Sequence, residues 1–223
     1  LQAEIPLKNQ KFLFRQVGPP LHRGPFTKTE LAYLFEKTNF AKFQKRGYPS
    51  HYWAPMLAAF TGARRSEIFF LTIDDIKEKH GIHFISINDN DDKKIKTTTS
   101  IRTVPIHKKL VELGFLEYVE KVHSRPGASR LFPEYKDHQG QAGYKFTDAF
   151  GRFIKSTREQ LSEDQQKDFD GYRGLHSFRH LFVKETREIE MSDAASRILV
   201  GHSKGTDVHE GYGGPASEKQ EKP

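Results

Sequence analysis

Residues 174–212 read GLHSFRHLFVKETREIEMSDAASRILVGHSKGTDVHEGY and contain side chains suited to chemistry on a phosphate group. His176 and Arg179 are spaced i, i+3, so a helix places them on the same face. An arginine there can donate two N–H groups to phosphate oxygens, and the histidine beside it can accept a proton. A Gly-His pair ending at His202 and then Tyr212 follow along the chain. The segment therefore predicts a phosphate site with a phenolic nucleophile.

The composition is that of a globular chain with a strongly charged surface. Its 223 residues, 35% of them hydrophobic, are enough to bury the core of one domain or two small ones. The sequence has no apolar run long enough to cross a membrane and no basic-then-apolar leader. The lack of Cys excludes disulfides, thiolate metal sites and a cysteine nucleophile, and it fits a cytoplasmic protein. Because the first residue is Leu1 and not Met, we expect a piece of a longer protein.

Positive charge is concentrated near the start of the chain. The net charge is +7, and residues 1–50 hold nine Lys or Arg against three Glu, which is +6 of that total. A basic arm on a nearly neutral body is typical of nucleic-acid binding, although a solvated lysine-rich surface is an equal alternative. The candidate DNA-binding residues are Lys8, Lys11, Arg15, Arg23, Lys45 and Arg46.

The sequence pattern predicts a mostly helical domain with a small sheet. Residues 1–24 lack periodicity and are interpreted as an arm or linker. Strands are expected at 83–87 and 101–106, with a further strand between them, and residues 161–173 are expected to form a surface loop. Helices are expected at the capping box Thr27-Lys-Thr-Glu30, over about 50–62, in a short piece after Gly62, along the stripe from Val111 to Val122, after an N-cap at Thr147, over 176–188, and from Ser192 to Gly201. These elements describe an α+β fold.

Upstream segments offer the cations that such a site still lacks. Phosphoryl transfer spreads negative charge over the equatorial oxygens, so more than one cation is needed. The segment TGARRSEI, residues 61–68, offers a second arginine at Arg64. Lys96, in the middle of the predicted sheet, is placed to protonate a leaving oxygen. Residues of these types more often serve in structural ion pairs or in packing when taken one at a time, so it is their combination that carries the prediction.

Taken in order, these motifs resemble the catalytic domain of the tyrosine recombinases, the phage-integrase family of site-specific DNA recombinases. The resemblance covers roughly residues 25–212, and five motifs in sequence make it specific. Ala63 stands where leucine is frequent in the family, which changes packing and leaves the chemistry in place. The motifs are Thr61-Gly62-Ala63-Arg64 with Ser66-Glu67, Lys96 before Arg102-Thr-Val-Pro105, His176-x-x-Arg179, Leu199-Val-Gly-His202, and Tyr212.

The resemblance implies a division of the chain and a fold. Residues 1–24 are expected to be a basic arm or interdomain linker, 25–212 the catalytic domain, and 213–223 a disordered tail. An upstream DNA-binding domain is expected to be absent from this sequence. The implied architecture is mostly helical with a small antiparallel three-stranded sheet, as in the tyrosine recombinases and type IB topoisomerases.

The resemblance also implies a DNA strand transesterification that uses no metal, no cofactor and no ATP. Tyr212 is expected to attack a DNA phosphate, leaving a 3′-phosphotyrosyl enzyme and a free 5′-hydroxyl. The phosphotyrosine keeps the bond energy, so rejoining to another strand needs no other energy source. The resemblance implies that Arg64 and Arg179 bind the nonbridging phosphate oxygens and that His202 donates a hydrogen bond to the phosphate. It implies that His176 is the general base and Lys96 the general acid. Glu67 is implied to hold the Arg64 region in place.

Other residues of suitable type fit the family's order or spacing less well. Tyr172 precedes the His-x-x-Arg pair, which excludes it as the nucleophile. His180 and His209 are expected to pack or to hydrogen-bond. The competitors for the cationic roles are Arg65, beside Arg64, and Lys93 and Lys94, before Lys96.

The expected partners are double-stranded DNA attachment sites of a phage or other mobile element, copies of the same chain in a tetramer on DNA, and an accessory DNA-bending or directionality factor. No membrane is expected, and the location is the cytoplasm, at the nucleoid. Two alternatives remain: a type IB topoisomerase-like enzyme, which rejoins the same strand, and a catalytically idle DNA-binding module of the same fold. The short spacing from His202 to Tyr212 favours a recombinase. Because Gly-Gly-Pro follows Tyr212, the tyrosine segment is expected to move, and the isolated domain to bind DNA weakly and cleave it poorly.

Overall fold

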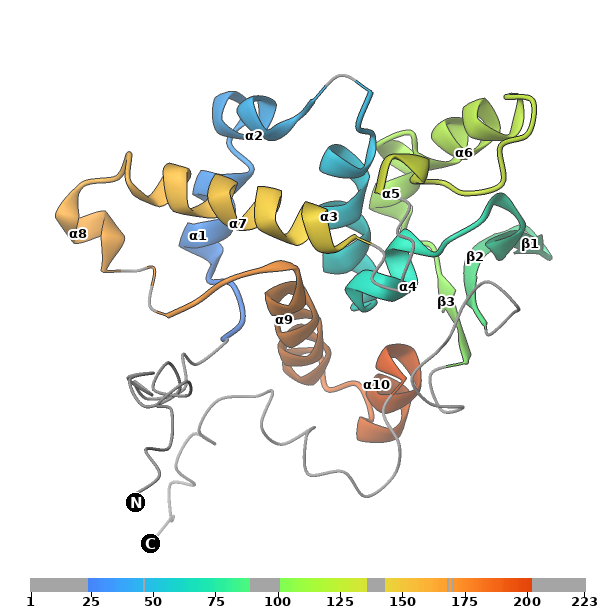
Figure 1. Cartoon of the computed structure of the whole chain (residues 1–223). Coiled ribbons are helices and arrows are strands. Elements are labelled where there is room, and N and C mark those ends of the chain that lie inside the picture. Colours follow the sequence, from blue (N-terminus) through green and yellow to red (C-terminus); the bar gives the residue numbers. More distant parts are fainter. Residues whose placement is uncertain are drawn as a thin grey trace, which may run out of the picture.

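The computed structural model describes residues 24–45, 47–88, 101–135, 143–167, 169 and 171–201. Within these ranges the chain forms a mostly helical domain with a small antiparallel three-stranded sheet, which confirms the predicted α+β fold class (Figure 1). Residues 1–23 and the predicted tail, 213–223, lie outside the described residues, so the division of the chain stays a prediction.

The helices surround a central pair. Helix α3 (Ser50–Thr61) lies in the middle of the domain and packs against α9 (Leu175–Glu188) (Figure 1). The other elements are α1 (Lys28–Leu34), α2 (Lys37–Phe43), α4 (Arg65–Phe69), α5 (Lys108–Glu112), α6 (Phe115–His123), α7 (Tyr144–Arg158), α8 (Glu163–Gln166) and α10 (Asp193–Val200), with 3-10 turns η2 (Ile73–Asp75) and η4 (Pro133–Tyr135). Helices α1, α2 and α7 lie on one side of α3, and the sheet with α6 lies on the other.

Phenylalanine side chains fill the space between these helices. Phe43 of α2 stacks on Phe153 of α7 with ring centroids 4.8 Å apart, and Phe26 contacts Phe178 of α9 at 4.5 Å. All four rings are buried. Burying one such ring contributes about 1.5–3 kcal/mol. The cluster therefore fixes the start of α9, where Phe178 lies between His176 and Arg179 in the sequence.

Local sequence sets the helix ends near the site as predicted. In the capping box of α1, Thr27 Oγ1 accepts from the Glu30 N–H at 3.0 Å, and Glu30 Oε2 accepts from the Thr27 N–H at 2.6 Å. Helix α3 ends at Gly62 with φ +62°, and α10 runs from its Ser192 cap to Gly201 with φ +69°. Glycine adopts this left-handed conformation without a Cβ clash. Gly62 and Gly201 thus end the two helices whose C-termini meet at the site.

The sheet has the order β1-β2-β3, with β1 at Ile76–Lys79, β2 at Ile82–Ile87 and β3 at Arg102–Pro105. Both neighbouring pairs are antiparallel. Ile85 of β2 lies opposite Val104 of β3, and both side chains are buried. The two strands predicted around 83–87 and 101–106 are therefore confirmed.

The described sheet contains one strand that the sequence pattern did not predict. The strand predicted between the other two lies outside the described residues, except for Asn88, so it stays a prediction. Among the described residues, β2 pairs with β1, whose residues are mostly charged and carry no alternating apolar pattern. A tight turn at His80-Gly81, with φ of 53° and 76°, joins them. This turn geometry matches the twist of paired strands, so it and the main-chain ladder override the side-chain pattern.

Several helix boundaries also differ from prediction. Helix α7 begins after Gly143 and not at Thr147, whose hydroxyl donates to the Gly143 carbonyl oxygen at 3.3 Å inside the first turn. The expected helix through Val111–Val122 is divided between α5 and α6 at Gly114, where φ is +88°. The expected loop at 161–173 contains the short helix α8, capped by Ser162. Across the described ranges, none of the helices combines the length and apolar character needed to cross a membrane.

Candidate functional site

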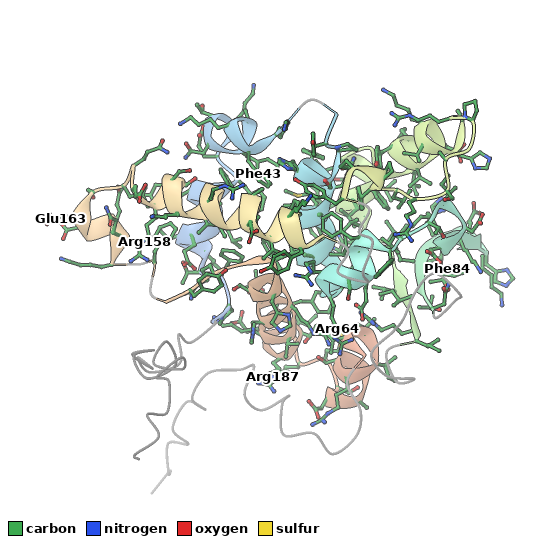
Figure 2. All side chains as sticks on the ribbon, viewed as in Figure 1. Phe43, Arg64, Phe84, Arg158, Glu163 and Arg187 are labelled. Atoms are coloured by element: carbon green, nitrogen blue, oxygen red, sulfur yellow. The ribbon has the colours of Figure 1, made fainter. Side chains whose placement is uncertain are left out.

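Arg64 lies at the start of α4, directly after the Gly62 turn, and faces α10 (Figure 2). Its main-chain N–H donates to Glu67 Oε2 at 2.7 Å, and its guanidinium Nη1 donates to Glu67 Oε1 at 2.8 Å. Glu67 therefore caps the first turn of α4 and orients the arginine side chain at the same time. The Arg64 side chain is 27% exposed, so an anion in solution can reach it.

A second arginine, Arg102 of β3, shares the Glu67 carboxylate. Arg102 donates from Nη2 to Oε2 at 2.7 Å and from Nη1 to Oε1 at 3.1 Å, a fork-on-carboxylate arrangement. The side chains of Glu67 and Arg102 are only 5% and 2% exposed. Burial acts to raise the pKa of Glu67, but the hydrogen bonds and charge of Arg102, with those of Arg64, outweigh it and lower that pKa to about 2. Glu67 is therefore a carboxylate at neutral pH.

Three arginines converge on the last carbonyl groups of α10. The final carbonyls of a helix have no donor within the helix, and they carry the negative end of its dipole. Here each of three successive carbonyl oxygens, which we call the carbonyl triplet (Leu199–Gly201), accepts from a different guanidinium group. The pairs are Arg102 Nε with Leu199 O at 2.7 Å, Arg179 Nη2 with Val200 O, and Arg64 Nη2 with Gly201 O at 3.2 Å.

The carbonyl triplet brings together groups that are distant in the sequence. Its three donors come from β3, from α9 and from the start of α4. The triplet directly precedes His202 in the chain. The end of α10 is thus held from three directions at the point where the chain leads to the predicted phosphate-binding histidine.

Arg179 joins α9 to the end of α3 as well as to α10. Its Nη1 donates to the carbonyl oxygen of Gly62 at 2.8 Å, and the residue is only 1% exposed. Gly62 is constrained on its other side, since a Cβ there would lie 2.9 Å from Phe182 Cδ1 and 3.2 Å from Val200 Cγ1. Only a glycine permits this close approach, which places Arg179 beside the turn that leads to Arg64.

His176 lies one turn before Arg179 on α9. Its ring contacts that of His180 edge-to-face, with centroids 5.0 Å apart. The segment entering α9 is fixed by Arg173, whose Nε lies 2.9 Å from Oε1 of the fully buried Glu30. Helix α9 therefore carries the predicted base and the predicted clamp on a segment tied to α1 by a buried ion pair.

The structure brings Arg64, Glu67, Arg179 and, nearby on α9, His176 into one region. The remaining predicted catalytic residues, Lys96, His202 and Tyr212, lie outside the described residues. The same holds for Lys8, Lys11, Arg15, Arg23 and Arg46 of the predicted DNA-binding set, and for Lys93, Lys94 and His209. Lys45 is described, and its ammonium lies 4.3 Å from the centre of the Tyr48 ring.

Two alternative residues lie elsewhere. Arg65, the competitor of Arg64, projects toward α7, where its guanidinium carbon is 5.7 Å from the centre of the Tyr144 ring. Tyr172 is 40% exposed in the segment before α9. Among the residues that the structure describes, no three His, Cys, Asp or Glu side chains are grouped as metal ligands would be.

Sequence reasoning missed Arg102 as a member of the site. It entered only as part of the Arg-Thr-Val-Pro motif after the predicted lysine. The strand alternates buried and exposed residues, so the pattern that buries Val104 also buries Arg102. A buried arginine requires a carboxylate or carbonyl partner. The strand alternation that predicts burial of Arg102 was therefore the sequence signal that could have identified it. The identity of the partner, Glu67, was not readable from the sequence.

The chain belongs to the phage integrase family, whose pattern matches residues 27–216. No curated protein sequence matches the chain. The family match agrees with the resemblance that the ordered motifs predict.

Solved structures share the fold at low sequence identity. The chain is similar to XerH site-specific recombinase bound to palindromic difH substrate in a post-cleavage complex, with a TM-score of 0.57 and 19% identity over 93% of this chain and 54% of that one. It is similar to the Tn1549 transposon integrase in complex with transposon right end DNA, with a TM-score of 0.58 and 20% identity over 86% of this chain and 62% of that one. It is also similar to a lambda integrase(75-356) dimer bound to a COC' core site, with a TM-score of 0.53 and 18% identity over 96% of this chain and 69% of that one. The chain thus spans 54% and 62% of the lengths of the first two.

Proposed function

We propose that this chain contains the catalytic domain of a site-specific DNA recombinase, which cleaves and rejoins DNA through a phosphotyrosyl intermediate at Tyr212. The proposed domain covers residues 25–212, with a basic arm before it and an upstream DNA-binding domain in the whole protein. Its proposed substrates are duplex attachment sites of a mobile element. Family membership and the DNA-bound recombinases of the same fold support this class of activity.

The observation that carries the proposal is the convergence of Arg64 and Arg179 on consecutive carbonyl oxygens directly before His202. The two arginines are far apart in the sequence, yet the fold brings both to the end of α10. Phosphoryl transfer needs several cationic donors around one phosphate, because charge spreads over its equatorial oxygens. A guanidinium group has five N–H donors, so main-chain carbonyls and a phosphate are compatible partners for it. The cluster therefore suits a phosphate held beside His202.

The proposed chemistry is a balanced transesterification. The Tyr212 phenol oxygen forms a bond to the DNA phosphorus, and the bond from phosphorus to the 5′-oxygen breaks. His176 accepts the phenolic proton, and Lys96 donates a proton to the leaving 5′-oxygen. Arg64, Arg179 and His202 stabilise the negative charge on the nonbridging oxygens. The reverse reaction with a 5′-hydroxyl from another duplex then completes strand exchange without ATP.

A nicked-duplex trapping assay tests the proposal. Cleavage next to a nick releases a short strand and leaves the protein covalently attached to DNA, so the adduct appears on a denaturing gel. We expect the whole protein to form it on duplexes drawn from the genomic DNA around its gene. Tyr212→Phe should abolish the adduct, and Tyr172→Phe should keep it.

Strand exchange distinguishes the recombinase from its rivals. Two differently labelled duplexes should yield recombinant strands if the proposal holds. Relaxation of supercoiled DNA without exchange would indicate a topoisomerase-like enzyme. DNA binding without any adduct would indicate an idle binding module, and an adduct that persists in Tyr212→Phe would exclude the proposed nucleophile.

A further inference from the structure

We propose that Arg102 is a positioning residue of this active site. It fixes Glu67 against Arg64 and, through the Leu199 carbonyl oxygen, fixes the end of α10 that leads to His202. The inference rests on the proposed function, because it assigns Arg102 a part in the same reaction. Arg102 contacts neither substrate nor nucleophile in this assignment and acts only through the groups it holds.

The geometry of one guanidinium group carries the inference. Arg102 uses Nη1 and Nη2 on the two oxygens of Glu67, at 3.1 and 2.7 Å, and turns Nε to the Leu199 carbonyl oxygen at 2.7 Å. Its side chain is 2% exposed, and Nε, Nη1 and Nη2 are all directed at Glu67 and the Leu199 carbonyl oxygen. The donors thus connect the first arginine motif to the end of α10 across the interior of the domain.

The rest of the fold holds Arg102 in turn. Its Cα lies opposite that of Ile87 in the β2–β3 ladder, so the sheet fixes its main chain. A planar guanidinium presents several donors in fixed directions, whereas a lysine ammonium is a single compact centre on a flexible stem. Lysine can therefore pair with Glu67 but cannot hold the carboxylate and the Leu199 carbonyl oxygen in the same geometry.

Removal of Arg102 should misplace the groups proposed to contact the phosphate. The Glu67 carboxylate would keep only Arg64 as its arginine partner in this cluster, and would draw the Arg64 guanidinium toward itself. The Leu199 carbonyl would lose the Arg102 donor, and the last turn of α10 would loosen. Both effects would misplace Arg64 and the end of α10 that leads to His202, without removing either proposed phosphate contact.

The experiment compares Arg102→Met and Arg102→Lys with a matched control, Val122→Ala. Val122 is buried in α6, remote from α10, so its truncation destabilises the domain without touching the site. Single-turnover adduct formation on nicked DNA is measured with the whole protein, well below the melting temperature of each variant. Because displacement of about 1 Å can cost about 100-fold in rate, we expect Arg102→Met to cleave about 100-fold more slowly than the unmodified protein.

Further readouts separate positioning from general destabilisation. DNA affinity should change less than about threefold, because Arg102 is assigned no phosphate contact and acts through Glu67 and the Leu199 carbonyl oxygen. Arg102→Lys should cleave at an intermediate rate, and Val122→Ala at nearly the unmodified rate. In a double-mutant cycle, Arg102→Met should reduce the cleavage rate of the Arg64→Lys variant much less than it reduces the rate of the unmodified protein, because it acts through Arg64. Hydrogen exchange of a peptide covering α10 should accelerate in Arg102→Met and not in Val122→Ala.

The inference is overturned if Arg102→Met cleaves at the unmodified rate or if Val122→Ala slows cleavage as much as Arg102→Met does. It is also overturned if hydrogen exchange of the α10 peptide is unchanged in Arg102→Met. Full additivity in the double-mutant cycle would also overturn it. Failure of the unmodified protein to form any adduct would instead count against the proposed function. In that case the exchange measurement still decides whether Arg102 holds the end of α10.

Discussion

The Nη1 group of Arg179 lies 2.8 Å from the carbonyl oxygen of Gly62, which joins α9 to the end of α3 across a separation of 117 residues. Gly62 begins the turn to Arg64, and Arg179 also donates to Val200. One buried side chain thus sets the distance between the two arginine motifs and the end of α10.

Gly62→Ala should lower the free energy of unfolding by about 2–4 kcal/mol, from the strained positive φ and the clash with Phe182. The φ is +62°, and the added Cβ would lie 2.9 Å from Phe182 Cδ1. Gly151→Ala on α7 is the matched control, because nothing lies within 4 Å of a Cβ there. That change should stabilise by about 0.5–1 kcal/mol, as alanine does within a helix. Urea unfolding measures both, and equal effects would contradict the close approach at Gly62.

Glu67→Gln should make stability less dependent on acid pH. The pKa of Glu67 is lowered from 4.5 to about 2, so the folded state binds fewer protons than the unfolded state in this range. Its contribution is complete above about pH 4.5 and is lost as pH falls toward 2. At 1.36 kcal/mol per pKa unit, the unmodified protein should lose about 3 kcal/mol more unfolding free energy than the variant as the pH falls through this range. The prediction is wrong if the difference in unfolding free energy between the unmodified protein and Glu67→Gln stays constant from neutral pH to about pH 2.5.

Arg173→Met should destabilise the domain by about 3–5 kcal/mol, because it leaves a buried carboxylate without its positively charged partner. Glu30 is fully buried, and Arg173 Nε lies 2.9 Å from its Oε1. Adding Glu30→Gln should recover part of the loss by removing the buried charge. The exposed Arg152 of α7 provides the control, with Arg152→Met expected to change stability by less than about 0.5 kcal/mol. Chemical denaturation measures all four proteins, and a double variant weaker than Arg173→Met would contradict the explanation.

His176→Ala should slow adduct formation by about 10²–10⁴-fold, as expected for removal of a general base. His180→Ala removes the ring that contacts His176 at 5.0 Å and should cost less than about tenfold. Single-turnover cleavage of nicked DNA compares them at equal DNA occupancy. If His180→Ala is the slower variant, the assignment of the base to His176 is wrong.

Neutralising the basic arm should weaken the salt dependence of DNA binding. Each phosphate that a protein contacts contributes a slope of about −0.9 to log K against log salt. Replacing Lys8, Lys11 and Arg15 by Gln should therefore flatten the slope by up to about three such contributions. The same replacement at Lys108, Lys121 and Lys155 serves as the control, because these residues are exposed on α5, α6 and α7. An unchanged slope in the arm variant would identify residues 1–24 as a solvated linker.

Much of the fold follows from short-range rules that operate within a few residues. The capping box at Thr27 and the glycine stops at Gly62 and Gly201 act through local hydrogen bonds and φ angles, so those helix ends matched their prediction. Strand β1 was not predicted, because its charged residues join the sheet through a turn at His80-Gly81 and main-chain bonds to β2. Side-chain periodicity carries no signal for such a strand.

The sequence by itself determined the motif order, the helices that carry His176 and Arg179, and hence the family. Helix spacing and the order of motifs are properties of the chain alone. Only the tertiary structure decided that Arg102 shares Glu67 with Arg64, and that three arginines bind three successive carbonyl oxygens at the end of α10. A buried guanidinium must find acceptors, but any carboxylate or helix end satisfies that demand. Which of them it meets depends on how α3, α9, α10 and the sheet pack, and no local pattern encodes that choice.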